Sequence, residues 1–132
     1  MKYLLDTDIS SYYLRGRYNL LDVFLRKGIG NIRLSRPTVA QLEVLAYKNP
    51  SSVINLSAIQ SLCEKFNVLE VDIGTWQNFS KLKAETELEG TIIGDIDILI
   101  TSIATQYDLI VVTNNEKHFE GLVEVENWTV NN

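Results

Sequence analysis

Apolar residues occur along the chain in two alternating arrangements: short runs, which are typical of strands, and longer stretches with helical spacing. Strand-like runs lie at residues 3–5, 32–34, 66–71, 109–112 and 122–125. Helical stretches with capping residues, proline or glycine at their ends lie at 7–15, 20–27, from 37 onward, from 51 onward, 72–88 and 95–107. Strands that alternate with helices at this spacing predict an α/β three-layer sandwich with a mainly parallel central sheet.

Three of these segments carry more specific expectations. The run at 109–112 is apolar at every position, which predicts a strand buried on both faces. The polar Thr7 and Asp8 can cap the first helix. The helix at 72–88 is expected to be amphipathic, with Asp72 as its cap and Gly90 as its end.

The composition is that of an ordinary globular protein. Of 132 residues, 45% are hydrophobic and 22% are charged, so we expect one compact domain over residues 1–132. Cys63 is the only cysteine and cannot form an internal disulfide, which makes the cytoplasm the default location. We find no apolar stretch long enough for a signal peptide or a membrane span, and we expect no membrane partner.

The formal net charge of −5 argues against a broad electrostatic grip on a phosphate backbone, which normally comes from excess lysine and arginine. An acidic site that holds a divalent cation can still receive a phosphate, because the cation is then the largest local charge. The charge therefore restricts how a nucleic acid could be bound without excluding it.

Polar residues follow two of the predicted strands. Asp6 ends the first, and Thr113, Asn114 and Asn115 end the run at 109–112. Ligands of open parallel sheets bind beyond the carboxyl ends of the strands, so these residues are candidates for function if both strands are central. Taken singly, Asp6 or Asp8 also reads as a helix cap, and the two asparagines as a turn.

Glu43 shares a helical stripe with Val39, Leu42 and Ala46, at positions i, i+3, i+4 and i+7. This spacing puts its carboxylate on the face that is expected to meet the core, where a charge needs a partner. The alternative is a position at the margin of the stripe, from which Glu43 reaches solvent.

Asp95 and Asp97 open the helix that runs to Tyr107. Carboxylates in the first turn are favoured by the helix dipole, which accounts for one of the two without any chemistry. The remaining one is free for a functional role.

Carboxylates that converge on one edge of the sheet repel one another and need a cation to be stable together. Oxygen ligands select Mg²⁺, with Mn²⁺ as an alternative, and such a site can activate water and stabilise charge on a scissile phosphate. No histidine is required for this chemistry. We interpret His118, the only histidine, as a surface or packing residue rather than a general base.

With these residues in view, the chain resembles the PIN domain and, within it, the VapC toxins of bacterial toxin–antitoxin pairs. The resemblance spans nearly the whole chain. It rests on Leu4 to Ile9, Leu14 to Gly16, Thr38 to Glu43, Leu82 to Ala84, Gly90, Ile93, Gly94, Asp97, Leu99, Ile100, Val112 to Asn115, His118, Phe119 and Glu126 to Trp128.

The resemblance implies a magnesium-dependent endoribonuclease. Its metal-binding acids would be Asp6, Glu43 and Asp97, with Asn115 as the fourth polar catalytic position. It also implies an RNA substrate, with transfer RNA as the expected class, a cognate antitoxin protein as inhibitor, and a homodimer.

Two departures from the family pattern concern the acids. Asn115 stands where many members have aspartate, so a second metal would be held weakly or only with substrate. Asp8 stands where relatives usually have asparagine or serine. Asp8 and Asp95 are the two residues that could compensate for the missing charge at position 115.

The leading hypothesis is thus metal-assisted RNA hydrolysis, with Arg15, Arg36, Lys81 and Lys83 as candidate contacts to the RNA backbone. A phospho-accepting receiver domain also places acids at strand ends, but it needs a lysine after a later strand, and this chain has asparagines there. The second alternative is a catalytically degenerate, PIN-like module that binds RNA or protein. It is favoured by Asn115, which is not an acid, and by the negative net charge of the chain.

Overall fold

The computed structural model describes residues 1–130, so residues 131 and 132 of the expected domain lie outside the described part. Its centre is a five-stranded sheet in the order β3-β2-β1-β4-β5, and every neighbouring pair is parallel. The expected α/β class with a parallel sheet is confirmed. The strands are β1 (Tyr3–Leu5), β2 (Ile32–Ser35), β3 (Val68–Leu69), β4 (Ile110–Val112) and β5 (Val125–Glu126).

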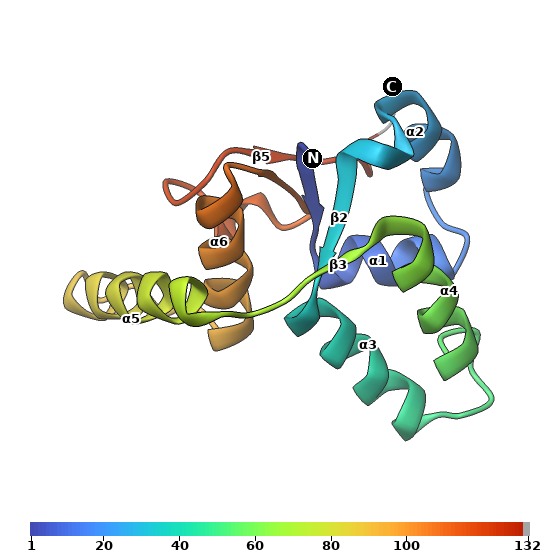
Figure 1. Cartoon of the computed structure of the whole chain (residues 1–132), viewed down its shortest axis with the longest axis horizontal. Coiled ribbons are helices and arrows are strands. Elements are labelled where there is room, and N and C mark those ends of the chain that lie inside the picture. Colours follow the sequence, from blue (N-terminus) through green and yellow to red (C-terminus); the bar gives the residue numbers. More distant parts are fainter. Residues whose placement is uncertain (131–132) are drawn as a thin grey trace.

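Helices cover both faces of this sheet. In Figure 1, α1 to α4 lie on one side of β1 and β2, and α5 and α6 lie on the other. The helices are α1 (Thr7–Leu14), α2 (Leu20–Lys27), α3 (Arg36–Lys48), α4 (Leu56–Phe66), α5 (Ile73–Leu88) and α6 (Asp95–Tyr107), with short 3-10 turns η1 (Ile29–Asn31) and η2 (Glu116–His118).

Strand β1 is the centre of the core because both of its faces are buried. Tyr3 and Leu5 belong to the cluster under α1 to α4, whereas Leu4 belongs to the cluster under α6. This alternation follows from the two-residue period of a strand. Its neighbour β4 divides in the same way, with Val111 on the α6 side and Val112 on the other, so both strands are buried on both faces, as expected for residues 109–112.

Several element boundaries differ from the sequence prediction. The strand expected at residues 66–71 covers only Val68–Leu69, because Phe66 is the last residue of α4. The first helix is capped by Asp6, whose carboxylate accepts a hydrogen bond from the Ile9 amide, and not by Thr7 or Asp8. The fourth helix begins at Leu56 behind its cap Asn55, because Ser52 forms a turn in which its hydroxyl accepts from the Ile54 amide.

The last strand also differs from the prediction. It covers Val125–Glu126 instead of residues 122–125. The amides of Leu122 and Val123 donate to the carbonyl of Phe119, so this segment closes a turn and cannot pair with β4.

Helix α5 is not amphipathic in the way the sequence suggested. Its buried residues are Thr75 and Thr86, while Ile73 and Trp76 are 76% and 50% exposed. The helix packs mainly against α6 and extends away from the sheet (Figure 1). Within residues 1–130, no helix combines the length and the apolar character needed to cross a bilayer.

Candidate active site

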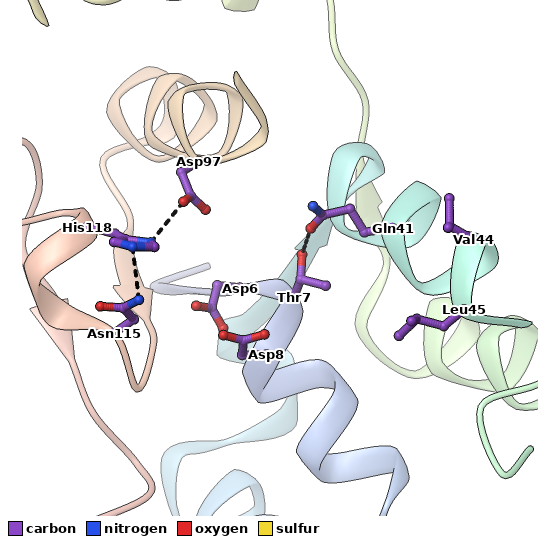
Figure 2. Close-up of a pocket in the computed structure, with 9 residues that line it drawn as sticks. All are labelled: Asp6, Thr7, Asp8, Gln41, Val44, Leu45, Asp97, Asn115 and His118. Carbon is purple, nitrogen blue, oxygen red and sulfur yellow. Dashed lines mark hydrogen bonds and ion pairs between the residues drawn. The ribbon is translucent and has the colours of Figure 1, made fainter. Parts of the chain in front are cut away.

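A pocket of about 510 Å³ opens at the edge of the sheet where β1 and β4 end (Figure 2). Asp6 follows β1 directly, and Asn115 lies three residues after the end of β4. Because β1 and β4 are neighbouring parallel strands, both residues lie at the same edge of the sheet. The lining residues are Asp6, Thr7, Asp8, Gln41, Val44, Leu45, Asp97, Asn115 and His118.

Asp6 is the most deeply buried acid of this pocket, with 5% of its surface exposed. One carboxylate oxygen accepts from the Ile9 amide at 2.9 Å, which fixes the side chain at the N-terminus of α1. The pKa of Asp6 is raised to about 7, mainly by burial and also by the negative charges of Asp8 and Asp97, while hydrogen bonds from Thr113 and Ile9 act in the opposite direction. At neutral pH the protonated and charged forms of this group are about equally populated, and a bound cation would favour the charged form.

Asp97 faces the same pocket from the first turn of α6 (Figure 2). Burial raises its pKa as well, while the facing His118 ring lowers it and Asp8 raises it. His118 Nδ1 lies 3.0 Å from an Asp97 carboxylate oxygen. Asp97 is thus the second partly desolvated acid of the site.

His118 is a surface residue, as expected, and it also lines the pocket. Its Nε2 lies 3.0 Å from the Asn115 side-chain nitrogen, an N–H donor, so Nε2 accepts and Nδ1 carries the proton that faces Asp97. The ring therefore links Asn115 to Asp97 across the pocket (Figure 2). It remains largely exposed on its outer side.

Glu43 is not among the residues that line the pocket, contrary to the expectation that it joins Asp6 and Asp97. Gln41 of the same helix takes that place. Two residues of α-helix correspond to about 200° of rotation, so these side chains point to nearly opposite sides of α3. The charge of Glu43 instead acts on Arg36 and on Cys63 of α4.

The wall formed by α3 is neutral and partly apolar. The Thr7 hydroxyl donates a hydrogen bond to the Gln41 side-chain oxygen, which holds the amide at the rim of the pocket (Figure 2). Val44 and Leu45 continue the same wall as apolar side chains. This side of the pocket offers hydrogen bonds and apolar contacts rather than a charge.

Asp8 and Asp95 were the two acids expected to compensate for the neutral Asn115, and only one of them lies in the pocket. Asp8 lines the pocket from the first turn of α1. Asp95 does not line it and forms an ion pair with Lys83, at 2.5 Å. Asp8 is the one that can act on the site.

Three of the four predicted contacts to an RNA backbone are engaged by other side chains, whereas Lys81 is exposed. Lys83 is paired with Asp95, Arg36 is paired with Glu70 at 2.6 Å, and the Arg15 Nε donates to the Ser11 hydroxyl. No lysine or arginine is among the lining residues of the pocket. The lining residues of the pocket thus include three carboxylates and one histidine but no lysine or arginine.

The donor types around the pocket fit a hard divalent cation. Carboxylate and amide oxygens are the ligands that Mg²⁺ and Mn²⁺ prefer. Within residues 1–130, no three His, Cys, Asp or Glu side chains converge closely enough to enclose an ion. Mg²⁺ does not need such a cage, since it usually keeps several waters and binds one or two carboxylates together with a substrate phosphate. Asp6 and Asp97 are the residues that would hold it.

Comparison with known proteins identifies the fold and the family. Residues 3–123 match the family model described as PIN domain. This chain belongs to the PIN-domain family. The match covers the whole pocket, from Asp6 to His118.

The relatives of this PIN-domain protein are named as VapC nucleases. Ribonuclease VapC2 of Haemophilus influenzae is 32% identical over 131 residues, covering 97% of this chain and 98% of that protein. The protein of Shigella flexneri named tRNA(fMet)-specific endonuclease VapC is 27% identical, covering 98% and 99%. The VapBC-1 structure from nontypeable Haemophilus influenzae superimposes with a TM-score of 0.85 at 26% identity, covering 98% of this chain and 100% of that one. The PIN-domain protein is thus homologous to the VapC ribonuclease toxins of VapBC toxin–antitoxin systems.

The raised pKa of Asp6 predicts that the metal-free protein loses stability as the pH rises. Between the ordinary pKa of 3.8 and the folded-state value of about 7, the folded protein retains a proton that the unfolded chain has released. The free energy of unfolding therefore falls from about pH 4 to about pH 7 and then levels off. Asp6→Asn keeps the helix cap but removes the buried acid, so it should raise stability at pH 8 by about 1–3 kcal/mol.

Urea unfolding of both proteins at several pH values, with chelator present, measures this difference. Adding Mg²⁺ should raise the melting temperature of the unsubstituted protein more than that of Asp6→Asn. An Asp6→Asn variant that is less stable at pH 8 would contradict the assigned burial cost of the Asp6 charge.

Proposed function

We propose that this PIN-domain protein is a magnesium-dependent endoribonuclease, the toxin of a VapBC-type pair, and that Asp6 and Asp97 hold its metal ion. The observation that carries the proposal is the pair of partly desolvated carboxylates in a pocket without lysine or arginine. Such a pair lowers its own repulsion by binding a cation that a phosphate can share. The VapC relatives, which are named ribonucleases, support the same reaction class.

The roles of the residues follow from their positions. A bound Mg²⁺ supplies an activated water and neutralises charge that develops on the scissile phosphate; Mn²⁺ fits the same oxygen ligands. Asp6, whose carboxylate is fixed at the end of β1 by the Ile9 amide, would hold the ion. Asn115, the fourth polar residue of the site, orients His118, which in turn orients the Asp97 carboxylate. Val44 and Leu45 contact the apolar faces of the RNA and help exclude water.

Transfer RNA is the proposed substrate class. The Shigella flexneri relative is named as a tRNA(fMet)-specific endonuclease. With a net charge of −5 and no lysine or arginine in the pocket, this chain gains little affinity from phosphate contacts. Recognition of a folded RNA by shape, with one exposed strand entering the pocket, fits this charge distribution.

A non-catalytic RNA- or protein-binding module is the second candidate. The observation in its favour is that two lining positions, Gln41 and Asn115, carry amides. Amides weaken the affinity for a cation compared with carboxylates. A module of this kind would bind Mg²⁺ negligibly, which separates it from the enzyme.

Cleavage of transfer RNA with Mg²⁺, with chelator and with Asp97→Asn tests the enzyme directly. We expect chelation to abolish cleavage, and Asp97→Asn to reduce the rate at least about 100-fold, because a metal ion contributes several kcal/mol to such a reaction. Glu85→Gln, on the exposed side of α5, is the matched control for loss of one negative charge and should cleave normally. Cleavage that persists unchanged in Asp97→Asn would refute the assigned site.

We further propose a cognate antitoxin as inhibitor and a homodimer as the active assembly. The superimposed structure is named VapBC-1, and VapBC is named elsewhere among the similar structures as a family of toxin–antitoxin systems. An acidic pocket without lysine or arginine can accept a basic side chain from a bound peptide. A small protein encoded beside this chain should co-purify with it and stop cleavage. Light scattering of the free protein should give twice the 15.0 kDa of the chain. A monomeric mass, or cleavage that continues in the complex, would contradict the respective proposal.

A further inference from the structure

We propose that Gln41 selects the nucleobase beside the scissile bond, by donating a hydrogen bond from its side-chain nitrogen to a carbonyl oxygen of the base. The inference rests on the proposed function, because it assumes that RNA enters the pocket. It assigns a specificity-determining role to a residue of α3 that neither holds the metal ion nor takes part in the link between Asn115 and His118.

The orientation of the Gln41 amide is fixed by its neighbours. Its oxygen accepts a hydrogen bond from the hydroxyl of Thr7, the first residue of α1. The Thr7 hydroxyl oxygen in turn lies 3.4 Å from that of Thr38, which is fully buried. Because a carboxamide carries an acceptor on one side and a donor on the other, this contact decides which of the two faces the pocket. The accepting oxygen is occupied, and the donating nitrogen is presented.

The Gln41 nitrogen is a donor that remains available to a ligand. Among residues 1–130, no hydrogen bond engages it, and Figure 2 shows it at the tip of the side chain, on the side that faces Asp97. The other side-chain nitrogens of the pocket are engaged, since that of Asn115 is bonded to His118 and the His118 ring faces Asp97. A ligand group beside Gln41 must therefore be a hydrogen-bond acceptor.

Val44 and Leu45 give the same wall a surface for the flat face of a base. They follow Gln41 by three and four residues, so the three side chains share one face of α3. Val44 is 54% exposed, and the pocket of about 510 Å³ is large enough for a small ligand. A nucleobase carries its polar atoms on its edges, so a base that packs on these apolar side chains turns one edge toward Gln41.

The phosphate of the same nucleotide is expected elsewhere in the pocket. It belongs beside Asp6 and Asp97, where a cation would neutralise its charge. Gln41 lies across the pocket on α3, beside apolar side chains. Since the two sides line one pocket, the base that Gln41 contacts belongs to a nucleotide directly at the scissile bond.

A donor of fixed orientation distinguishes bases by the group on the edge that faces it. Guanine presents the acceptor O6 and uracil the acceptor O4, whereas adenine and cytosine carry donating amino groups at the corresponding positions. Two donors that face each other form no hydrogen bond and are both left unpaired. We therefore expect guanine or uracil to be preferred roughly 2–10-fold over adenine and cytosine, which is the worth of one neutral hydrogen bond.

Cleavage of an RNA pool that is randomised within a single-stranded segment tests this inference. We expect sequencing of the cut ends to show guanine and uracil enriched at one position beside the cleaved bond. Gln41→Met keeps the length of the side chain but removes the donor, so the enrichment should disappear at that position alone. Thr7→Val removes the hydroxyl that orients the amide, and it should abolish the enrichment although Gln41 is present. Glu85→Gln should keep it, and melting curves establish that each variant is folded.

The base preference does not depend on the amount of active protein, so it separates a role in selection from a role in folding. If RNA is cut without the enrichment, or if Gln41→Met retains it, the role of Gln41 is overturned and the nuclease stands. A cleavage rate that falls equally for all four bases in Gln41→Met also overturns it, because the amide would then contact the phosphate or the ribose.

Failure of the proposed function has a different signature. If the protein cuts no RNA from the pool, the nuclease is refuted, and the same pool is then selected by binding to the protein in chelator. Bound RNA with an enrichment of guanine and uracil that Gln41→Met abolishes still supports the selection by Gln41. Bound RNA without this enrichment, or no bound RNA, overturns it.

Discussion

The structure of the site depends on the burial of one carboxylate, that of Asp6, between the end of β1 and the start of α1. The side chain is needed there as the cap of α1, yet its position removes it from water and brings it within range of the charges of Asp8 and Asp97. A buried charge without a partner is costly, and a divalent ion is the partner that the surrounding oxygen atoms favour. The position of Asp6 therefore stabilises the start of α1 and also leaves a buried carboxylate that a cation would stabilise.

Most of the fold could be predicted from the sequence because β1 and β4 are apolar at every position and end in polar residues. Because β1 and β4 are neighbouring parallel strands, the residues that follow them lie at the same edge of the sheet. Asp6 and Asn115 were predicted at this edge for that reason, and both line the pocket. The last strand and the start of α4 were misplaced because local turns at Ser52 and Phe119 took the backbone hydrogen bonds. Turns of this kind leave little trace in the apolar pattern.

The error at Glu43 has a rotational cause. The stripe of Val39, Leu42 and Ala46 correctly marks the buried face of α3, but Glu43 lies at its margin toward Arg36 and Cys63. The pocket is lined by the neighbouring face of α3. Thr38, Gln41 and Leu45 lie on this face, at spacings of three and four residues. Thr38 of this face is fully buried and lies within 3.4 Å of the Thr7 hydroxyl, a contact that is visible only in the structure. The same holds for His118, because its link to Asp97 depends on the turn after β4.

The central claim is that Asp6 and Asp97 share a divalent ion in this pocket. Diffraction from a crystal soaked in Mn²⁺, recorded at the manganese absorption edge, locates such an ion directly. The account predicts one strong anomalous peak between the carboxylates of Asp6 and Asp97. A peak beside Glu43, or no peak at a concentration that saturates other Mn²⁺ sites, would contradict it.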